Sequence, residues 1–384
     1  MRYQLKIPAR INILGNPTDG NEGDFATISA AVNIFAGAIV EEAEGVVLEV
    51  IPRTQALDSA LSCVMEGEEH LETLRGEHPL RYDGQSDLLK GAVNRLFSYS
   101  AEFREKYARK GVHIAVWSDV PRQSGLGGSS LFVLLALAGL REFYGLDPAG
   151  HNDYVLAELA QRVEARELGI TCGYADRYVP LFGGIAYLDY RGKLHQTDID
   201  GEPYVTYEYL DNWVQELPFV AVTTGIQHDS GDVHGRMRPR YVQEYDAWLL
   251  EKGEPPLLVR LMQQAYETAW QGKAALLRGD LECFGHLMNN NHRLVDEMMS
   301  QCGFCDGAGW ANNLFVQVAL ENGALGAKLT GAGGGGSVFA LVRPGEEARL
   351  AEIWERTAGQ NGLCQACIYR PHIVHHGILI EAID

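Results

Sequence analysis

The chain has 384 residues, of which 46% are hydrophobic and 22% are charged, enough for one large or two medium domains with buried cores. Its formal charge of −19 repels nucleic acids and anionic membrane surfaces, so neither is expected as a partner. The longest apolar run, Leu131–Leu140, is too short to span a bilayer, and the first residues contain no signal-peptide core. We therefore expect a cytoplasmic globular protein, while the sequence leaves its oligomeric state open.

The first part of the chain is predicted to contain both strands and helices. The expected strands are 3–14, 38–44, 46–51, 111–117 and 183–190, with 38–44 and 46–51 forming a hairpin near Gly45. The expected helices are 87–109, 131–143 and 151–168. The expected loops are 15–23 and 173–181, and the polar segment 57–80 is predicted to be a helix or a loop.

The second part continues the mixture of strands and helices. The expected elements are a strand at 219–224, a polar loop at 228–240, two or three helices over 240–323, a buried strand at 338–342, a helix at 348–358, and a closing strand pair within 368–380. We place a domain boundary near Gly192, which divides the chain into 1–191 and 192–384. This order of elements predicts an α+β fold with mixed sheets in two lobes.

A glycine-rich stretch, DVPRQSGLGGSSL at Asp119–Leu131, separates an expected strand from an expected helix. Its three glycines remove side chains, so that backbone N–H groups can converge on an anion near the positive end of the helix dipole. Ser129 and Ser130 stand at the helix start, where a hydroxyl can cap the backbone or reach a magnesium ion that bridges phosphates. The stretch predicts a phosphate-binding loop, with a serine-capped tight turn as the alternative.

A second glycine run, Gly331–Gly336, comes just before a buried strand, an unusual place for one. Two acidic residues lie between the two glycine loops, Glu164 near the end of a helix and Asp176 in the expected loop GYADR. Their order in the sequence suits a metal ligand, Glu164, followed by a base, Asp176. A turn cap is the alternative for a single loop aspartate.

Seven cysteines include two C-x2-C pairs, Cys302 with Cys305 and Cys364 with Cys367. Such pairs can bind zinc, but these two lie far apart in the sequence and no closely spaced histidines accompany them. An odd number of cysteines in a chain without an export signal indicates reduced thiols. We therefore expect reduced thiols rather than a zinc site.

Three segments, in the right order, resemble the motifs of the GHMP kinase superfamily of sugar, homoserine and mevalonate kinases. ARINILGNPTDGN at 9–21 resembles its first motif, PRQSGLGGSS at 121–130 its phosphate loop, and KLTGAGGGGSV at 328–338 its third motif, which braces the other two. The resemblance covers most of the chain. It implies a two-lobed α+β fold with an N-terminal, ribosomal-S5-like, ATP-binding lobe and a C-terminal, ferredoxin-like lobe.

The resemblance also implies ATP and Mg²⁺, and it assigns roles to single residues. Asp176 falls on the aspartate that orients or deprotonates the substrate hydroxyl, and Arg10 on a basic residue near that hydroxyl. Ser129 and Glu164 fall on magnesium ligands, although the shifted serine doublet leaves Ser130 as an alternative to Ser129, with a helix cap as its expected role. The implied nucleotide-binding residues are Pro121, Gly125, Leu126, Gly127, Gly128, Ser129 and Ser130.

Within the superfamily the sequence is most similar to glucuronokinase-type sugar 1-kinases, through GNPTD, PRQSGLGGSS, ELGITCGYADR and DSGDVHGRMRPRY. The last segment contains His234 and several arginines that could supply positive charge to a uronic acid carboxylate. Arginine binds carboxylates through forked hydrogen bonds, and Arg177 is a second candidate. The expected substrate-binding residues are Asn16, Asp19, Arg177, Arg236, Gly333 and Gly334.

Other functions stay open. EARELGITCGYADRY also resembles bacterial heptose-phosphate kinases, although Tyr174 and Ala175 replace the Lys and Gln of their pattern. Another small-molecule kinase, a mevalonate diphosphate decarboxylase or a sugar sensor without turnover would share the fold, but a sensor has no need of a base such as Asp176. The charge of −19 argues against RNA binding. The favoured prediction is ATP- and magnesium-dependent phosphorylation of the anomeric hydroxyl of glucuronic acid or a similar sugar.

Overall fold

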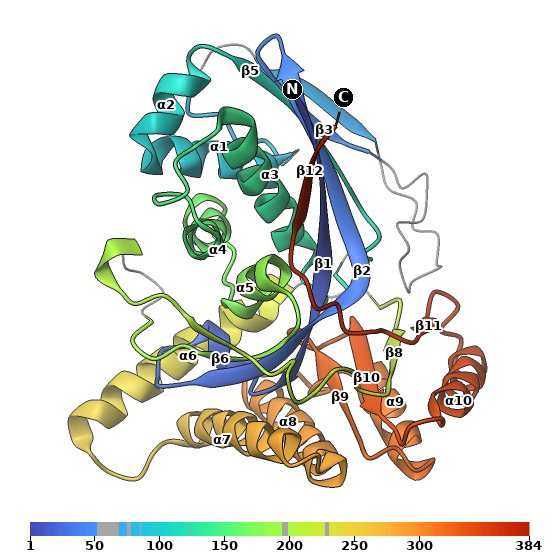
Figure 1. Ribbon diagram of the computed structural model, residues 1–384. Coiled ribbons are helices and arrows are strands. Elements are labelled where there is room, and N and C mark those ends of the chain that lie inside the picture. The colour runs from blue at the N-terminus through green and yellow to red at the C-terminus, as the bar shows by residue number, and fades with distance from the viewer. Residues whose placement is uncertain are drawn as a thin grey trace.

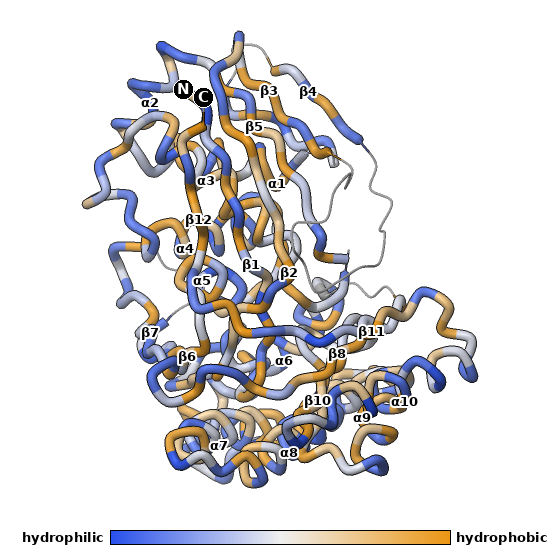
Figure 2. The backbone as a smooth tube through the Cα atoms, turned by 45° about the vertical axis from the view of Figure 1, so that its right-hand side comes forward, coloured by the Kyte–Doolittle hydropathy of each residue, from blue (hydrophilic) through white to orange (hydrophobic). Residues whose placement is uncertain are grey.

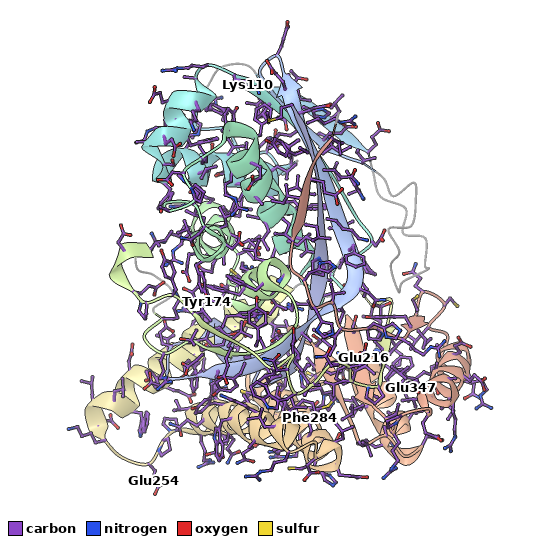
Figure 3. All side chains as sticks on the ribbon, viewed as in Figure 1. Lys110, Tyr174, Glu216, Glu254, Phe284 and Glu347 are labelled. Atoms are coloured by element: carbon purple, nitrogen blue, oxygen red, sulfur yellow. The ribbon has the colours of Figure 1, made fainter. Side chains whose placement is uncertain are left out.

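The computed structural model describes residues 1–51, 69–74, 78–84, 86–121, 123–193, 199–226 and 230–383. These residues form two β-sheets, each covered by helices (Figure 1). Tyr174 and Phe284 lie in the interior, whereas Glu254 lies at the outer end of the connection between the long helices α6 (Ser230–Glu251) and α7 (Leu257–Leu277) (Figure 3). No helix in these ranges is long and apolar enough to cross a membrane.

The larger sheet has eight strands in the order β12-β1-β2-β5-β3-β4, with β6 paired to β2 and β7 paired to β6. The strands are β1 (Arg2–Leu14), β2 (Ala26–Ala43), β3 (Val46–Val50), β4 (His70–Leu74), β5 (Gly111–Ser118), β6 (Ile185–Asp189), β7 (Thr206–Tyr209) and β12 (Leu379–Ile383). The 18-residue β2 pairs with β6 through its first part and with β5 through its second. Hydrophobic residues run along much of β2 (Figure 2), in keeping with a strand in the middle of a covered sheet.

Helices pack on one face of this sheet and carry much of the site. They are α1 (Asp87–Tyr99), α2 (Ala101–Tyr107), α3 (Gly128–Tyr144), α4 (Asp153–Arg162) with a π-helical turn (Val163–Glu167), and α5 (Ala175–Phe182). The middle of α3 is apolar all round because α3 packs between the sheet and helices α1 and α4. This packing fixes the start of α3 beside β1 and α5.

The smaller sheet contains β8 (Phe219–Thr223), β9 (Gly326–Thr330), β10 (Ser337–Leu341) and β11 (Cys367–Tyr369). Its helices, besides α6 and α7, are α8 (Leu281–Gln301), α9 (Trp310–Glu321) and α10 (Glu347–Gln360), and two short 3₁₀ turns lie at Thr18–Gly20 and Ile199–Gly201. The strand order is β11-β8-β10-β9 and every neighbour is antiparallel. When these four strands are numbered in chain order, the sheet order is 4-1-3-2, which is that of a ferredoxin-like sheet.

Several expected connections are wrong. The expected hairpin at 38–51 does not form, because β5 lies between β2 and β3, and β3 pairs with β5 in parallel. The expected closing strand pair is also absent, since β11 pairs with β8 and β12 pairs with β1. Alternating hydrophobicity shows that a segment is a strand but does not say which strand lies beside it. Of the polar segment 57–80, residues 70–74 form β4, and residues 57–68 and 75–77 lie outside the described residues.

Two expected loops are helical instead. Residues 175–182 form α5 and residues 230–251 form α6, although α6 contains Pro239. Val233, Met237 and Tyr241 are all buried, and their spacing of four places them on one side of a helix. Burial of that apolar side offsets the cost of an internal proline. Residues 230–321 therefore contain four helices rather than two or three.

The boundary near Gly192 stays a prediction. Both β7 and β12 lie beyond that residue, yet they extend the larger sheet through β6 and β1. The first lobe therefore receives strands from both sides of the predicted boundary.

The cysteines differ in part from expectation. Cys172, Cys283, Cys302, Cys305 and Cys364 are free, whereas Cys367 is disulfide-bonded. This corrects the expectation of reduced thiols, because a disulfide depends on how closely two thiols meet in the fold and not on their spacing in the sequence. In the described part of the chain, no group of three or more His, Cys, Asp or Glu side chains could hold a metal ion.

Candidate active site

Arg10 and Asp176 form the centre of the site. Arg10 lies in β1 and Asp176 in the first turn of α5. Arg10 Nε donates a hydrogen bond to Asp176 Oδ1 at 2.6 Å, and Arg10 Nη1 donates to the carbonyl oxygen of Gly125 at 2.6 Å. One guanidinium thus links the predicted base to the predicted phosphate loop.

Asp176 is held as a carboxylate with one oxygen open. Burial raises the pKa of Asp176, but the positive charges of Arg10 and Arg177 outweigh it and lower the pKa below its ordinary value. Oδ1 accepts from Arg10, whereas Oδ2 lies 3.7 Å from Arg177 Nη1 and 3.7 Å from the position that a Cβ on Gly127 would occupy. Oδ2 therefore faces the phosphate loop and can accept a further hydrogen bond.

Ser130, Glu164 and Arg177 form a buried chain beside this pair. Ser130 Oγ donates to Glu164 Oε1 at 2.7 Å, and Arg177 Nη2 donates to Glu164 Oε2 at 2.5 Å. Ser129, in contrast, is exposed at the start of α3. The expected helix cap at Ser130 is wrong, because its hydroxyl contacts Glu164. The geometry favours Ser130 over Ser129 as the hydroxyl that acts together with Glu164.

Arg177 is not available to a sugar carboxylate. Its side chain is only 2% exposed, and it donates to the carbonyl oxygen of Gly173 at 3.0 Å as well as to Glu164. Successive residues of a helix point about 100° apart, so Arg177 turns inward while Asp176 faces the loop. The expected contact of Arg177 with substrate is therefore replaced by a contact with Glu164.

The phosphate loop fits a phosphate group and a magnesium ion. Gly127 precedes α3 without any side-chain cap, so the N–H groups of the first turn have no capping acceptor. Ser124 Oγ is buried, with no hydrogen-bond partner in the described part of the chain. The oxygens of Ser130 and Glu164 are of the type that Mg²⁺ binds when phosphates and water complete its shell.

The other predicted loop residues give the loop its shape. Pro121 and Leu126 are buried, and the carbonyl oxygen of Leu126 accepts from Arg10 N at 3.5 Å. Gly125 and Gly127 have φ of 73° and 82°, a region that residues with a side chain rarely adopt. Gly128 is the first residue of α3.

Asp19 approaches Asp176 from the first motif. It lies in a 3₁₀ turn, and its Oδ2 accepts a hydrogen bond from the backbone N–H of Ala175 at 3.2 Å. Burial raises the pKa of Asp19, and the negative charge of Asp176 raises it further. Two carboxylates therefore meet at the start of α5.

Asn16 is held by Lys328, a residue that the sequence analysis missed. Lys328 Nζ donates to Asn16 Oδ1 at 2.7 Å and to the carbonyl oxygens of Asn12 and Leu329 at 3.1 and 2.8 Å. Asn16 Nδ2 is buried without a partner among the described residues. The available signal was a lysine inside the apolar strand before the third motif. Lys328 thus connects the third motif to the first.

The third glycine motif braces the phosphate loop, as its resemblance implied. A Cβ on Gly331 would lie 2.6 Å from the Cα of Gly125, so only glycine permits this approach. Ser337 Oγ donates to the carbonyl oxygen of Ser124 at 2.7 Å. The second and third motifs therefore meet backbone to backbone.

Gly333 and Gly334, which were expected to bind substrate, contact other parts of the second lobe. The N–H of Gly334 donates to the carbonyl oxygen of Ala308 at 2.8 Å, and a Cβ on Gly333 would lie 2.6 Å from Met299 Sδ. These contacts join the third motif to the end of α8 and the connection that follows it. They support a bracing role in place of substrate binding.

Arg236 does not face Asp176. Its Nε donates to Asp232 at 2.8 Å, its guanidinium lies 4.9 Å from the centre of the Phe304 ring, and its side chain is 53% exposed. The segment is a helix rather than the expected loop, so positions 234 and 236 point to different sides. His234 and Arg238 lie on the side of α6 toward the first motif, and His234 lies within the reach of the charges of Asp176 and Arg10.

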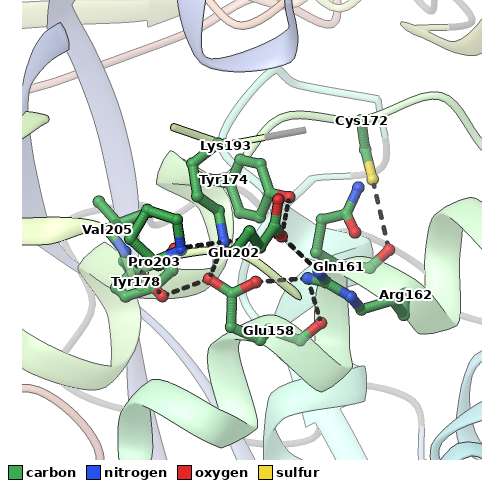
Figure 4. Close-up of polar contacts among 10 residues, drawn as sticks. All are labelled: Glu158, Gln161, Arg162, Cys172, Tyr174, Tyr178, Lys193, Glu202, Pro203 and Val205. Atoms are coloured by element: carbon green, nitrogen blue, oxygen red, sulfur yellow. Dashed lines mark hydrogen bonds and ion pairs between the residues drawn. The ribbon is translucent and has the colours of Figure 1, made fainter. Parts of the chain in front are cut away.

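A buried cluster of four charged side chains lies next to Tyr178 of α5 (Figure 4). Glu158 and Arg162 of α4 meet Lys193 and Glu202, and Arg162 pairs with both glutamates. Lys193 Nζ lies 2.7 Å from Glu158 Oε1 and 2.9 Å from Glu202 Oε1. Tyr178 of α5 donates to Glu158 Oε1 at 2.5 Å. The cluster ties α5 to α4, and its sequence signal is the spacing of four between Glu158 and Arg162 on an apolar helix.

Comparison with known proteins identifies the family of the chain. Residues 87–184 match the family described as GHMP kinases N terminal domain, and residues 312–360 match GHMP kinases C terminal. The galactokinase of Thermococcus kodakarensis is 31% identical over 263 residues, which are 64% of this chain and 69% of that protein. The probable glucuronokinase 2 of Arabidopsis thaliana is 29% identical over 91% of this chain and 87% of its own.

Two further similarities span nearly the whole chain. The D-glycero-alpha-D-manno-heptose 7-phosphate kinase of Campylobacter jejuni is 24% identical over 93% of this chain and 94% of its own. The crystal structure of Lactococcus lactis galactokinase complexed with galactose superimposes with a TM-score of 0.74 at 19% identity, over 99% of this chain and 95% of that chain. This last likeness shows the fold.

These findings define the class of the protein, and the resemblance seen in the three motifs is confirmed. The chain belongs to the GHMP kinases. Within that family it is a sugar kinase, a phosphotransferase.

Proposed function

We propose that the protein transfers the γ-phosphoryl group of ATP to a hydroxyl of a sugar, with the help of Mg²⁺. The observation that carries this proposal is the Arg10 guanidinium, which bonds both to Asp176 and to the Gly125 carbonyl oxygen of the phosphate loop. A phosphoryl acceptor held at Asp176 therefore lies next to the loop that cradles phosphates. Phosphoryl transfer depends chiefly on such positioning and on charge neutralisation.

Asp176 Oδ2 is the atom that binds the attacking hydroxyl. Its partner oxygen is fixed by Arg10, so the carboxylate cannot turn away when the sugar enters. Because the pKa of Asp176 is lowered, the carboxylate is a weak base that orients the hydroxyl and accepts its proton late in the transfer. Arg10, beside the loop, offers positive charge to the transferring group.

Glu164 and Ser130 would hold the magnesium ion. Arg177 fixes the other Glu164 oxygen, so the carboxylate keeps its orientation. When bound, the ion neutralises negative charge on the phosphate oxygens. The open N–H groups at the start of α3 bind those oxygens from the protein side.

For the sugar, we propose the anomeric hydroxyl of glucuronic acid or a similar sugar. Two relatives named as glucuronokinases, each covering 91% of this chain, support it. A neutral sugar such as galactose is the second candidate, because the arginines described near Asp176 already have carboxylate partners. These pairs are Arg10 with Asp176, Arg177 with Glu164, and Arg238 with Glu22.

The first experiment is an ADP-release assay with ATP and magnesium against glucuronic acid, galacturonic acid, galactose, mannose, a heptose 7-phosphate, mevalonate and homoserine. A preference for a uronic acid supports the favoured substrate, whereas galactose turnover favours the second candidate. A heptose phosphate as the best substrate would overturn both.

Asp176→Asn tests the base. This variant keeps an oxygen for Arg10 but loses the open carboxylate oxygen, so kcat should fall by about 100-fold or more. Binding of ATP, measured by calorimetry, should change little. An unchanged kcat would rule out the role of Asp176.

A further inference from the structure

The first turns of α6 present different residues on different sides. Val233 and Met237 pack into the apolar core of the second lobe. His234 and Arg238, each one residue further along the helix, lie toward the first motif, where Arg238 Nε donates to the carbonyl oxygen of Gly20 at 3.1 Å. The side of α6 that carries His234 therefore forms a wall next to the 3₁₀ turn of Asp19.

His234 lies beside the 3₁₀ turn that carries Asp19, an expected substrate-binding residue. A Cβ built on Gly20 would lie 3.8 Å from His234 Nδ1, and the same position is 4.0 Å from the Cα of Gly173. His234 lies close enough to Arg10 and Asp176 to interact with their charges. It is half-buried, and its ring nitrogens have no hydrogen-bond partner among the described residues.

The charged groups around His234 are already paired with one another. Arg10 of β1 bonds to Asp176, and Arg177 of α5 bonds to Glu164. Asp19, in the 3₁₀ turn, accepts from the backbone of α5. Arg238 of α6 bonds to Glu22 after that turn. None of these bonds involves His234, whose ring lies within the reach of the charges of Asp176, Arg177, Arg10 and Arg238.

We infer that the His234 imidazole contacts the sugar directly and recognises one of its hydroxyl groups. This inference rests on the function proposed above and names a specificity-determining residue of the same site.

The chemistry of the ring selects a hydroxyl over a carboxylate. Burial lowers the pKa of His234, the charge of Asp176 raises it, and the nearby arginines lower it further, to about 4, so the ring is neutral at physiological pH. A neutral imidazole has one donor and one acceptor nitrogen, and a hydroxyl can both accept and donate. A carboxylate offers acceptors alone. The inference thus replaces the expected charge contact between His234 and a uronic acid with a hydrogen bond to a hydroxyl group.

Calorimetry with the sugar panel, in the presence of Mg²⁺ and ADP, tests the inference on wild type, His234→Ala and His234→Gln. His234→Ala loses the contact, so it should bind the preferred sugar about tenfold more weakly than wild type. His234→Gln keeps a hydrogen-bond donor and an acceptor, so it should recover part of that affinity. His286→Ala, at an exposed position of α8, is the matched control. Melting temperatures show whether each variant is folded.

Deoxy analogues of the preferred sugar identify the contact. The analogue that lacks the contacted hydroxyl should bind wild type about tenfold more weakly than the full sugar does. His234→Ala should bind this analogue and the full sugar almost equally, because the hydroxyl and His234 are coupled when they touch directly. Sugar affinity should also stay level between about pH 6 and pH 8, because a neutral ring does not titrate there. Affinity that improves as the pH falls would mean that a charged ring binds a carboxylate, and would overturn the inference.

The outcomes separate this inference from the proposed function. A wild-type protein that binds a sugar without releasing ADP refutes the kinase activity, while weaker binding by His234→Ala still supports the contact. Equal binding by wild type and His234→Ala overturns the contact whether or not ADP is released. No binding of any panel sugar to wild type overturns both.

Discussion

Arg10 determines both the charge and the orientation of Asp176. Its guanidinium bonds to Oδ1, and its charge is the largest influence that keeps the buried carboxylate ionised. The same side chain reaches the carbonyl oxygen of Gly125. Arg10 therefore couples the position of the phosphate loop to the position of the predicted base.

Ser129 and Ser130 provide a matched pair of variants. Ser130→Ala removes the hydroxyl that donates to Glu164, so we expect a lower kcat and a higher magnesium concentration for half-maximal activity, by about tenfold. Ser129→Ala, at an exposed position, should change either value less than twofold. Magnesium titrations of both variants check this. The opposite ranking would return the metal-ligand role to Ser129.

Asp19 makes stability depend on pH. Its pKa is raised by burial and by Asp176, so its contribution to stability is present at low pH and is lost as the pH rises through the folded-state pKa. Asp19→Asn keeps an acceptor for the N–H of Ala175 but cannot ionise. We expect its melting temperature to exceed that of wild type by on the order of 2 °C at pH 7, with a smaller difference at pH 4. An equal difference in melting temperature at pH 7 and pH 4 would contradict the raised pKa of Asp19.

The sequence identified Arg10, Asp176 and Glu164 through motif positions, and the structure brings these residues together. It could not identify the partners of Arg177, because a charged residue next to Asp176 points inward or outward according to the helix on which it lies. Lys328 was missed for a related reason. Its acceptors include backbone carbonyl groups, which leave no trace in a sequence.

At the scale of elements, α6 shows the limit of local rules. Glycine, proline and charged residues predict a loop at 228–240, yet the segment is helical from Ser230 because its apolar residues recur every four positions and find a core. The change from loop to helix also changes the chemistry. Arg236 is exposed, whereas His234 lies within the reach of the charge of Asp176.

The cluster of Glu158, Arg162, Lys193 and Glu202 should contribute strongly to stability. Glu158→Gln keeps the shape of the side chain but removes its negative charge, which pairs with Arg162 and Lys193. The two buried cations then share Glu202 alone, so we expect the free energy of unfolding to fall by about 3 kcal/mol. Urea unfolding of both proteins, monitored by fluorescence, measures this change in the free energy of unfolding.

The exposed pair of Glu105 and Arg109 supplies the control for this measurement. Glu105→Gln should leave the urea midpoint nearly unchanged, because exposed ion pairs contribute little. Equal effects of the two substitutions would show that the buried cluster has no special role.

At the scale of the whole molecule, strands and helices were mostly found from periodicity, and the two-lobed fold followed from motif resemblance. What the sequence did not show is pairing between distant strands. The parallel contact of β3 with β5 and the addition of β12 to β1 both depend on segments that lie far apart in the chain. Residue patterns within each strand are the same whichever neighbour it has.

Removal of β12 tests its contribution. A chain that ends after Gly377 exposes the edge of β1, so we expect a melting temperature lower by several degrees and faster aggregation measured by light scattering. Glu381→Gln, which keeps the backbone ladder, should behave as wild type. A truncated protein that melts and scatters like wild type would show that β12 is dispensable.

The position of β12 also affects how the protein is made. The ribosome synthesises β1 first and β12 only after the whole second sheet, although the two strands are neighbours in the finished fold (Figure 1). While translation proceeds, the outer edge of β1 has no partner strand and can pair with other nascent chains. We expect newly made chains to depend on chaperones during this interval, and slower translation of the second lobe to lower the yield of folded protein.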